Sequence, residues 1–169
     1  MTGLRLEGRA RIVGDDVNTD YIITSKRKRD SLDPKVLSRF LLETVDPAFA
    51  ASVRPGDILV AGKNFGCGSA MEVAATVILG AGIPAVLAQS FSRTYYRNAI
   101  NNGLFPIVCE TSGISEGDIL VITADQDIMV RNEATGQSAV AQSLPPIVRG
   151  IVMAGGLVPY FRQHGDFEI

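Results

Sequence analysis

The sequence has no tryptophan, two cysteines and a single histidine. A closed zinc site needs more Cys and His ligands than these residues supply. An iron–sulfur cluster takes closely spaced cysteine thiolates, and Cys67 and Cys109 are far apart in the sequence. A Cys–His catalytic pair would need His164, which lies in a polar C-terminal stretch that we expect to be a poorly ordered tail. These scarcities argue against a metal or thiol site built by this chain alone.

Long apolar runs are missing as well. No stretch approaches the roughly 20 apolar residues of a membrane-spanning helix. Residues 1–8 alternate between polar and apolar, unlike a signal or transit peptide. The net charge of −2 gives no general attraction to nucleic acid or anionic membranes. We therefore expect a cytoplasmic protein with neither kind of partner, folded as one domain over residues 1–169.

Strands and helices alternate in the middle of the chain, which predicts a parallel α/β arrangement. Strands are expected at residues 58–61, 85–88 and 106–109, and helices at about 70–80 and 92–102. Antiparallel strands are expected on the flanks, at 4–13 with a possible break at Gly8, at 118–124, at 127–131 and before Pro145. Two further helices are expected, one after the Asp33 N-cap and one from Pro146 to about Gly155.

Residues 24–31 contain no apolar side chain. A segment of this composition cannot pack by itself, so we expect a mobile loop at about 24–32.

A glycine-rich loop, Asn64 to Ser69, follows one predicted strand and precedes a helix. Such strand ends bind ligands in α/β sheets, and helix N-termini offer free N–H groups to anions. A dinucleotide fingerprint fails here because Met71 occupies the position of its third glycine. A phosphate loop fails because no Lys-Ser or Lys-Thr pair follows.

Ser69 allows two interpretations. Ser69 to Glu72 has the pattern of a capping box, in which a serine N-cap is worth about 1 kcal/mol. Ser69 can also accept a proton, but the end of a helix favours an alkoxide by only ~0.3–1 kcal/mol, up to ~2. That is about one pKa unit. A Ser–His–Asp triad would depend on His164, so further stabilisation must come from cations or from a metal on a second polypeptide.

Three segments resemble the aconitase-type small subunits, which include those of isopropylmalate dehydratases. The loop from Asn64 to Ser69, with Glu72 and Ala74, is similar to the family pattern N-[FY]-G-x-G-S-S-R-E-x-A. Residues 89–104 resemble E-S-F-A-R-I-F-Y-R-N-A-I-N-N-G-L, and residues 14–20 resemble G-D-x-[IV]-x-T-D. The order and spacing agree over nearly the whole chain.

The resemblance implies a swivelling β/β/α domain with mixed parallel and antiparallel strands. It also implies a separate large subunit that carries a [4Fe-4S] cluster, in a heterodimer or heterotetramer, and a small subunit that is inactive alone. The implied reaction dehydrates and rehydrates a 2-hydroxy dicarboxylic acid, as in leucine biosynthesis. By position, Ser69 matches the family's base and Asp20 an active-site aspartate, while Gly68 and Ala70 flank the substrate. Asp20 can equally be a turn-forming residue.

The chain departs from the family in two places. Ala70 and Met71 replace a serine and an arginine that hold substrate carboxylate in aconitase-type enzymes. In the loop that varies with substrate, Arg29 matches a shared arginine and Lys28 replaces a leucine. The cations at 27–29 either bind the carboxylate that Met71 no longer serves or form a solvated basic loop.

The choice of substrate stays open between isopropylmalate and a related acid such as dimethylmalate, citramalate or homoaconitate. A non-catalytic anion-binding domain on the same fold is the competing class. Arg93, Arg97 and Asn98 lie on a predicted helix. They either form an ordinary solvated face, or support the serine loop or contact the large subunit.

Overall fold

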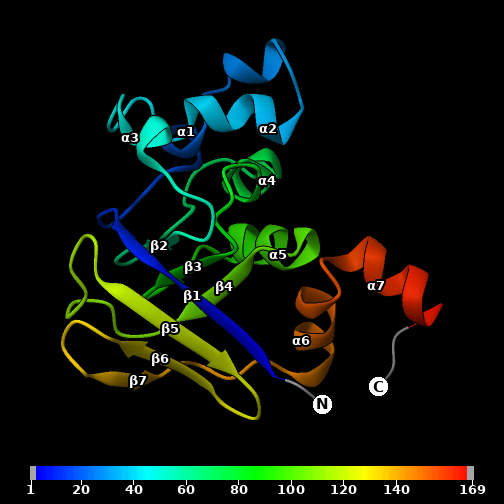
Figure 1. The fold of residues 1–169 in the computed structure, drawn as a ribbon. Helices are drawn as coiled ribbons and strands as arrows, with labels where there is room; N and C mark the ends of the chain where they lie inside the picture. The colour runs from blue at the N-terminus through cyan, green and yellow to red at the C-terminus, as the bar shows by residue number, and fades with distance from the viewer. Residues whose placement is uncertain (1–2, 167–169) are drawn as a thin grey trace.

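One mixed sheet of seven strands organises the chain, in the order β4-β3-β2-β1-β5-β6-β7 (Figure 1). The computed structural model describes residues 3–166. The strands are β1 Leu4–Ile12, β2 Ile58–Val60, β3 Ala85–Ala88, β4 Phe105–Val108, β5 Ile119–Ala124, β6 Ile128–Asn132 and β7 Ser138–Val140. Strands β1 to β4 pair in parallel, and β1, β5, β6 and β7 pair antiparallel. The predicted mixed sheet is confirmed.

Strand β1 joins the two halves of the sheet. Its residues 10–12 pair in parallel with β2, and its residues 4–9 pair antiparallel with β5. Gly8 does not break the strand. A Cβ at Gly8 would lie 1.9 Å from the carbonyl oxygen of Gly56, so glycine lets the turn before β2 approach β1 closely.

The helices are short. They are α1 Thr19–Ile22, α2 Pro34–Leu37, α3 Phe49–Ser52, α4 Val73–Gly80, α5 Arg93–Asn102, α6 Pro146–Met153 and α7 Leu157–His164, with 3₁₀ turns η1 Arg27–Arg29 and η2 Ser38–Phe40. The predicted N-cap of α2 is confirmed, because the Asp33 side chain accepts from Lys35 N. Gly103 ends α5 with φ 81°. Within residues 3–166, no helix combines the length and apolar character needed to cross a membrane.

Two apolar clusters cover the two faces of the parallel half, because successive residues of a strand point to opposite faces. Leu59 of β2 packs in the cluster that includes residues of α2 and α4. Its neighbours Ile58 and Val60 pack in the cluster that includes residues of α6, α7 and β5. This double coverage explains the continuous apolar runs of β2 and β3.

The C-terminal region differs from the prediction of a polar tail. Gly155 and Gly156, with φ 89° and 122°, form a turn from α6 into α7. A Cβ at Gly156 would lie 2.6 Å from the Asn101 carbonyl oxygen, so the turn packs closely against the end of α5. Helix α7 forms because Tyr160 is buried, and the His164 ring stacks on Tyr160 at 4.5 Å. Residues 167–169 of the expected tail lie outside the described residues.

A buried ion-pair network fixes the start of β2. Asp57 is 3% exposed and accepts hydrogen bonds from Arg9 Nη2 at 2.7 Å, Arg11 Nη1 at 3.4 Å and the Arg54 amide at 2.9 Å. Burial raises the pKa of Asp57, but the hydrogen bonds from Arg9 and Arg54 outweigh it and hold the pKa below its ordinary value of 3.8. Asp57 is therefore charged in the folded protein.

We expect Asp57→Asn to lower the free energy of unfolding by about 3 kcal/mol, because Arg9 loses its carboxylate partner and the buried Arg11 keeps only the more exposed Glu116. A carboxyl with a lowered folded pKa stabilises fully above its unfolded pKa of 3.8 and loses that contribution as pH falls through the folded value. Urea denaturation at pH 7 and across acid pH measures both effects. The control is Glu7→Gln in the exposed Arg5–Glu7 pair, which should change stability by under about 0.5 kcal/mol. Equal stability of the two variants would contradict the role of Asp57.

Candidate active site

The loop from Asn64 to Ser69 begins beyond the carboxyl end of β2 and has an unusual backbone. Asn64, Gly66 and Gly68 have φ of 58°, 77° and 96°. A Cβ at Gly66 would lie 2.1 Å from Cγ of Tyr95, and one at Gly68 would lie 2.5 Å from the Asn18 side chain. The two glycines are thus required both by the left-handed backbone and by their neighbours.

The segment 17–19 holds one side of this loop. Gly66 N donates to the Val17 carbonyl at 2.9 Å, and Thr19 N donates to the Cys67 carbonyl at 2.8 Å. The Thr19 hydroxyl donates to the carbonyl of Ser69 at 3.0 Å. Thr19 is buried, so this contact fixes the backbone of Ser69 from inside the protein.

The segment 90–92 holds the other side. Phe65 N donates to the Ser90 carbonyl at 3.0 Å, and Ser92 N donates to the Phe65 carbonyl at 2.9 Å. The Ser92 hydroxyl donates to Gly66 O at 2.8 Å, and Asn64 N donates to Ser90 Oγ at 2.7 Å. Of the three segments that resembled one family in the sequence, two are therefore hydrogen-bonded to the third, the loop 64–69.

Aromatic rings pack against the buried side of the loop. Phe65 is fully buried and contacts Tyr95 edge-on, with ring centroids 5.1 Å apart, and Phe91, with centroids 5.9 Å apart. The Tyr95 hydroxyl donates to the Ala74 carbonyl at 3.0 Å and so links α5 to α4. Burial raises the pKa of Tyr95, which keeps the phenol protonated as a donor.

Ser69 is exposed, and its hydroxyl makes no hydrogen bond within residues 3–166. The predicted capping box is wrong: α4 begins at Val73, its N-cap is Glu72, and no side chain caps it. Met71 is the physical reason, because it is only 7% exposed and packs into the core before the helix starts. A helix dipole acts mainly on its first turn, so it stabilises charge at Ser69 less than the sequence predicted.

Asp20 lies at the start of α1, one residue from Thr19. The Asn18 side chain accepts from Asp20 N at 2.9 Å, so Asn18 caps this turn and the Asp20 carboxylate does not. The exposed carboxylate accepts instead from the Ser25 hydroxyl at 3.2 Å. The sequence prediction missed the positioning roles of Asn18 and Thr19, although both lie within the segment 14–20 that it singled out.

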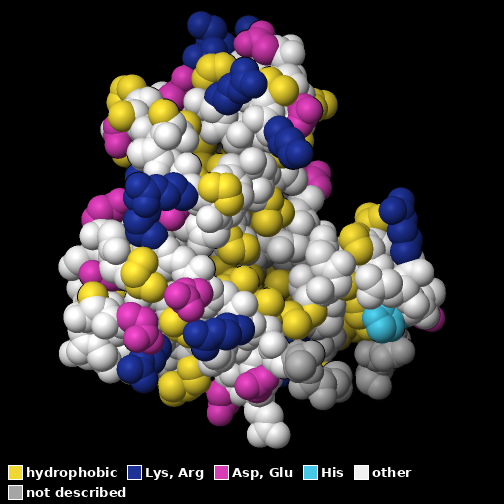
Figure 2. Space-filling model, viewed as in Figure 1, with side chains coloured by type: hydrophobic (Ala, Val, Ile, Leu, Met, Phe, Trp, Pro, Cys, Tyr) yellow, Lys and Arg dark blue, Asp and Glu magenta, His cyan; other side chains and the backbone are white. Residues whose placement is uncertain are grey.

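In the basic loop, residues 27–29, one cation already has a partner within the chain. Arg27 makes two hydrogen bonds to the Glu43 carboxylate, at 2.8 and 2.9 Å, and its guanidinium lies 3.8 Å from the Phe40 ring centroid. The hydrogen bond with Arg27 holds the pKa of Glu43 below its usual range. Arg27 is thus bound within the chain rather than available to a substrate. Figure 2 shows basic side chains gathered at the end of the molecule that carries α1 and α2.

Lys28 and Met71, the two departures from the family pattern, meet in space. Lys28 is half-buried, and its Nζ lies 3.0 Å from Sδ of Met71. Arg29 is exposed, as are Gly68 and Ala70 beside Ser69. The structure therefore places a lysine next to the residue that replaces the expected arginine.

The cysteines do not fit an iron–sulfur cluster. Cys67 is half-buried between two glycines, whereas Cys109 is buried, and burial raises its thiol pKa to about 11. Such clusters take several thiolates, and the sequence has only these two cysteines. No group of three or more His, Cys, Asp or Glu that could hold a metal occurs in the described part of the chain.

A mixed sheet with a clamped glycine–serine loop at its carboxyl edge defines an α/β domain of the aconitase swivel type. The chain belongs to the aconitase C-terminal domain family, which matches residues 17–112.

Similar proteins cover almost the whole chain. The 3-isopropylmalate dehydratase small subunit of Heliobacterium modesticaldum is 42% identical, over 94% of this chain and 96% of that protein. The methanogen homoaconitase small subunit of Methanocaldococcus jannaschii is also 42% identical, over 94% and 92%. The crystal structure of a 3-isopropylmalate dehydratase from the same organism matches with a TM-score of 0.89 and 39% identity, covering 96% of each chain. The expected fold and family are confirmed.

Two glycine variants isolate the contact between the loop and Tyr95. We expect Gly66→Ala to lower the free energy of unfolding by about 3 kcal/mol, since it combines a left-handed φ with a ring clash. Gly136→Ala is the matched control, because Gly136 has φ 73° and nothing within 4 Å of a Cβ. The free energy of unfolding of Gly136→Ala should fall by only about 1 kcal/mol. Urea denaturation of both variants tests this difference, and equal losses would show that the ring contact does not matter.

Proposed function

We propose that this chain is the small subunit of a two-subunit hydro-lyase of the 3-isopropylmalate dehydratase type, acting in leucine biosynthesis. The clamp that joins segments 17–19, 64–69 and 90–92 is the observation that carries the proposal. It presents the hydroxyl of Ser69 on an open surface, beside the segment that contains Asp20. The names of the similar small subunits support the same conclusion. The proposal includes one domain over residues 1–169 and a cytoplasmic location.

A large subunit that carries a [4Fe-4S] cluster completes the proposed enzyme, as a heterodimer or heterotetramer. The two cysteines of this chain cannot hold such a cluster. The chemistry assigned to the large subunit is Lewis acidity toward the hydroxyl and carboxylate of the substrate. We expect the isolated small subunit to be inactive.

The contribution of this chain is proton transfer and substrate orientation. The proposed base is the alkoxide of Ser69, whose Oγ removes the proton from the substrate carbon while the C–H electron pair forms the alkene. The hydroxyl group takes up a second proton, from solvent, and leaves as water. Addition of water at the neighbouring carbon then gives the isomer. Thr19 fixes the backbone of Ser69, and Asp20 lies next to Thr19. We assign carboxylate binding to Lys28 and Arg29, with Gly68 and Ala70 lining the substrate.

With the large subunit present, we expect Ser69→Ala to reduce kcat by about 10²–10⁴-fold, the usual contribution of a general base. The affinity for the large subunit should not change, because the Ser69 hydroxyl bonds nothing within the described residues. Ser138→Ala, at an exposed serine of β7, is the control and should retain full activity. Steady-state hydration assays measure kcat. Full activity of the Ser69 variant would rule out its role as the base, and no activity in the wild-type complex would favour the non-catalytic anion-binding domain.

One observation favours a related substrate as the second candidate. The half-buried Lys28, next to Met71, stands where isopropylmalate enzymes carry a leucine. Placing an ammonium group against an isopropyl branch costs desolvation energy without a compensating hydrogen bond. A smaller or more polar substituent, as in citramalate, dimethylmalate or homoaconitate, avoids this cost.

The identity of residue 28 should set the substrate preference. We expect Lys28→Leu to raise the ratio of kcat/KM for isopropylmalate over homoaconitate or citramalate by about tenfold, since an apolar contact replaces a cation. Lys28→Arg keeps the charge and should leave the ratio within about twofold of wild type. Competition assays on the reconstituted pair give the ratio directly. An unchanged ratio in Lys28→Leu would mean that residue 28 does not contact the variable substituent.

A further inference from the structure

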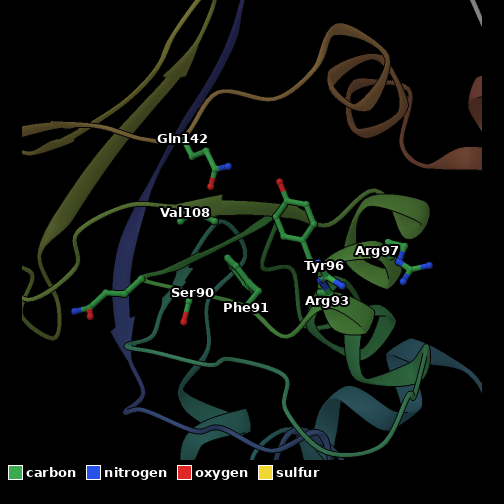
Figure 3. A pocket seen from close by; sticks show the side chains of 8 residues that line it. Ser90, Phe91, Arg93, Tyr96, Arg97, Val108 and Gln142 are labelled. Atoms are coloured by element: carbon green, nitrogen blue, oxygen red, sulfur yellow. The ribbon is translucent and has the colours of Figure 1, made fainter.

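We propose that Arg93 and Arg97 form the docking site for acidic side chains of the large subunit. The inference rests on the proposed function and adds the place where the partner binds. The two arginines line a hollow of about 640 Å³ that Phe91, Tyr96 and Gln142 also line. Figure 3 shows Arg93, Tyr96 and Arg97 on the α5 side of the hollow, with Gln142 across from them and Phe91 below.

The position of these two charges is unfavourable for the isolated helix. Arg93 is the first residue of α5, where a cation opposes the helix dipole. Arg97 lies one turn further along the same face, and like charges at this spacing repel each other. Both side chains are exposed, and neither forms an ion pair in the part of the chain that the structure describes.

Five other arginines are paired with carboxylates, and they are Arg5, Arg9, Arg11, Arg27 and Arg131. Arg93 and Arg97, like the exposed Arg29 and Arg54, form no ion pair among the described residues. What distinguishes Arg93 and Arg97 is that they lie one helical turn apart on the lining of one hollow without an internal counter-charge. Two guanidinium groups one helical turn apart suit carboxylates, because each can form paired hydrogen bonds to one.

The hollow is part of the same edge as the serine loop. Ser90 and Ser92, on either side of Phe91, make the hydrogen bonds that hold residues 64–66. A partner that brings a reactive group to the exposed Ser69 must approach this edge. Carboxylates bound at Arg93 and Arg97 would therefore fix the segment that positions the loop.

The shape of the hollow favours a protein partner over a small acid. It is an open depression, with Phe91 and Val108 among the apolar lining and arginine and glutamine side chains around them. An apolar centre with a polar rim, and arginine as an anchor, is typical of protein interfaces.

The experiment compares two double charge reversals in the co-purified complex with the large subunit. Arg93→Glu with Arg97→Glu should raise the dissociation constant of the complex at least tenfold. Analytical ultracentrifugation and biolayer interferometry measure this constant. Arg54→Glu with Arg131→Glu makes the same change in net charge at two exposed sites outside the hollow, and should bind within about twofold of wild type. Wild-type binding should weaken as salt rises, and the Arg93/Arg97 variant should lose most of this dependence.

Folding is checked on the isolated small subunit. The Arg93/Arg97 variant should melt at or above the wild-type temperature, because glutamate suits the first turn of a helix. Unchanged affinity of this variant for the large subunit would overturn the docking site. The docking site would also be overturned if citrate raised the melting temperature of the isolated wild type but not of the variant, because the hollow would then bind a small acid. If the complex is active and the charge reversals leave its affinity unchanged, only the docking site is ruled out. If the complex forms through Arg93 and Arg97 but hydrates no substrate, only the proposed function is ruled out.

Discussion

The structure depends on one set of backbone hydrogen bonds, in which segments 17–19 and 90–92 hold the loop 64–69 from its two sides. Glycine is required at 66 and 68 because Tyr95 and Asn18 fill the space that a Cβ would need. The parallel sheet brings the segments together, since β1, β2 and β3 all end at this edge. The position of Ser69 is thus a consequence of sheet topology rather than of its own local sequence.

Much of the fold could be predicted because it follows from local patterns. Alternating and continuous apolar runs located the strands, and Asp33 marked the start of a helix. The start of α4 could not be predicted, because the capping pattern at Ser69 was overridden by burial of Met71 in the core. Helix α7 was missed because the stretch around His164 was interpreted as a polar tail, whereas the buried Tyr160 holds the helix against the rest of the protein. The meeting of Lys28 with Met71 joins residues 43 positions apart, which no local pattern reveals.

Charge is distributed unequally over the molecule. Arg9 and Arg11 surround Asp57 beside the sheet, and Arg27 of the basic loop is held by Glu43 and Phe40. Around the loop, Lys28, Arg29, Arg93 and Arg97 form no ion pair among residues 3–166. Buried pairs hold one geometry, while unpaired surface cations attract carboxylates from outside. Arginine therefore has a structural role where it is paired and, in the proposed enzyme, a recognition role where it is unpaired.

The proposed role of Ser69 as a base needs more than its own loop provides. Its hydroxyl is exposed to water, and the helix that would favour its alkoxide starts four residues later. A dipole at that distance contributes little, because its effect falls off within the first turn. Cations around the loop act more strongly once water is excluded, since the effective dielectric constant then falls. Only a second surface that covers Ser69 can exclude that water, so the proposed chemistry of the loop and the proposed binding of a partner are one physical requirement.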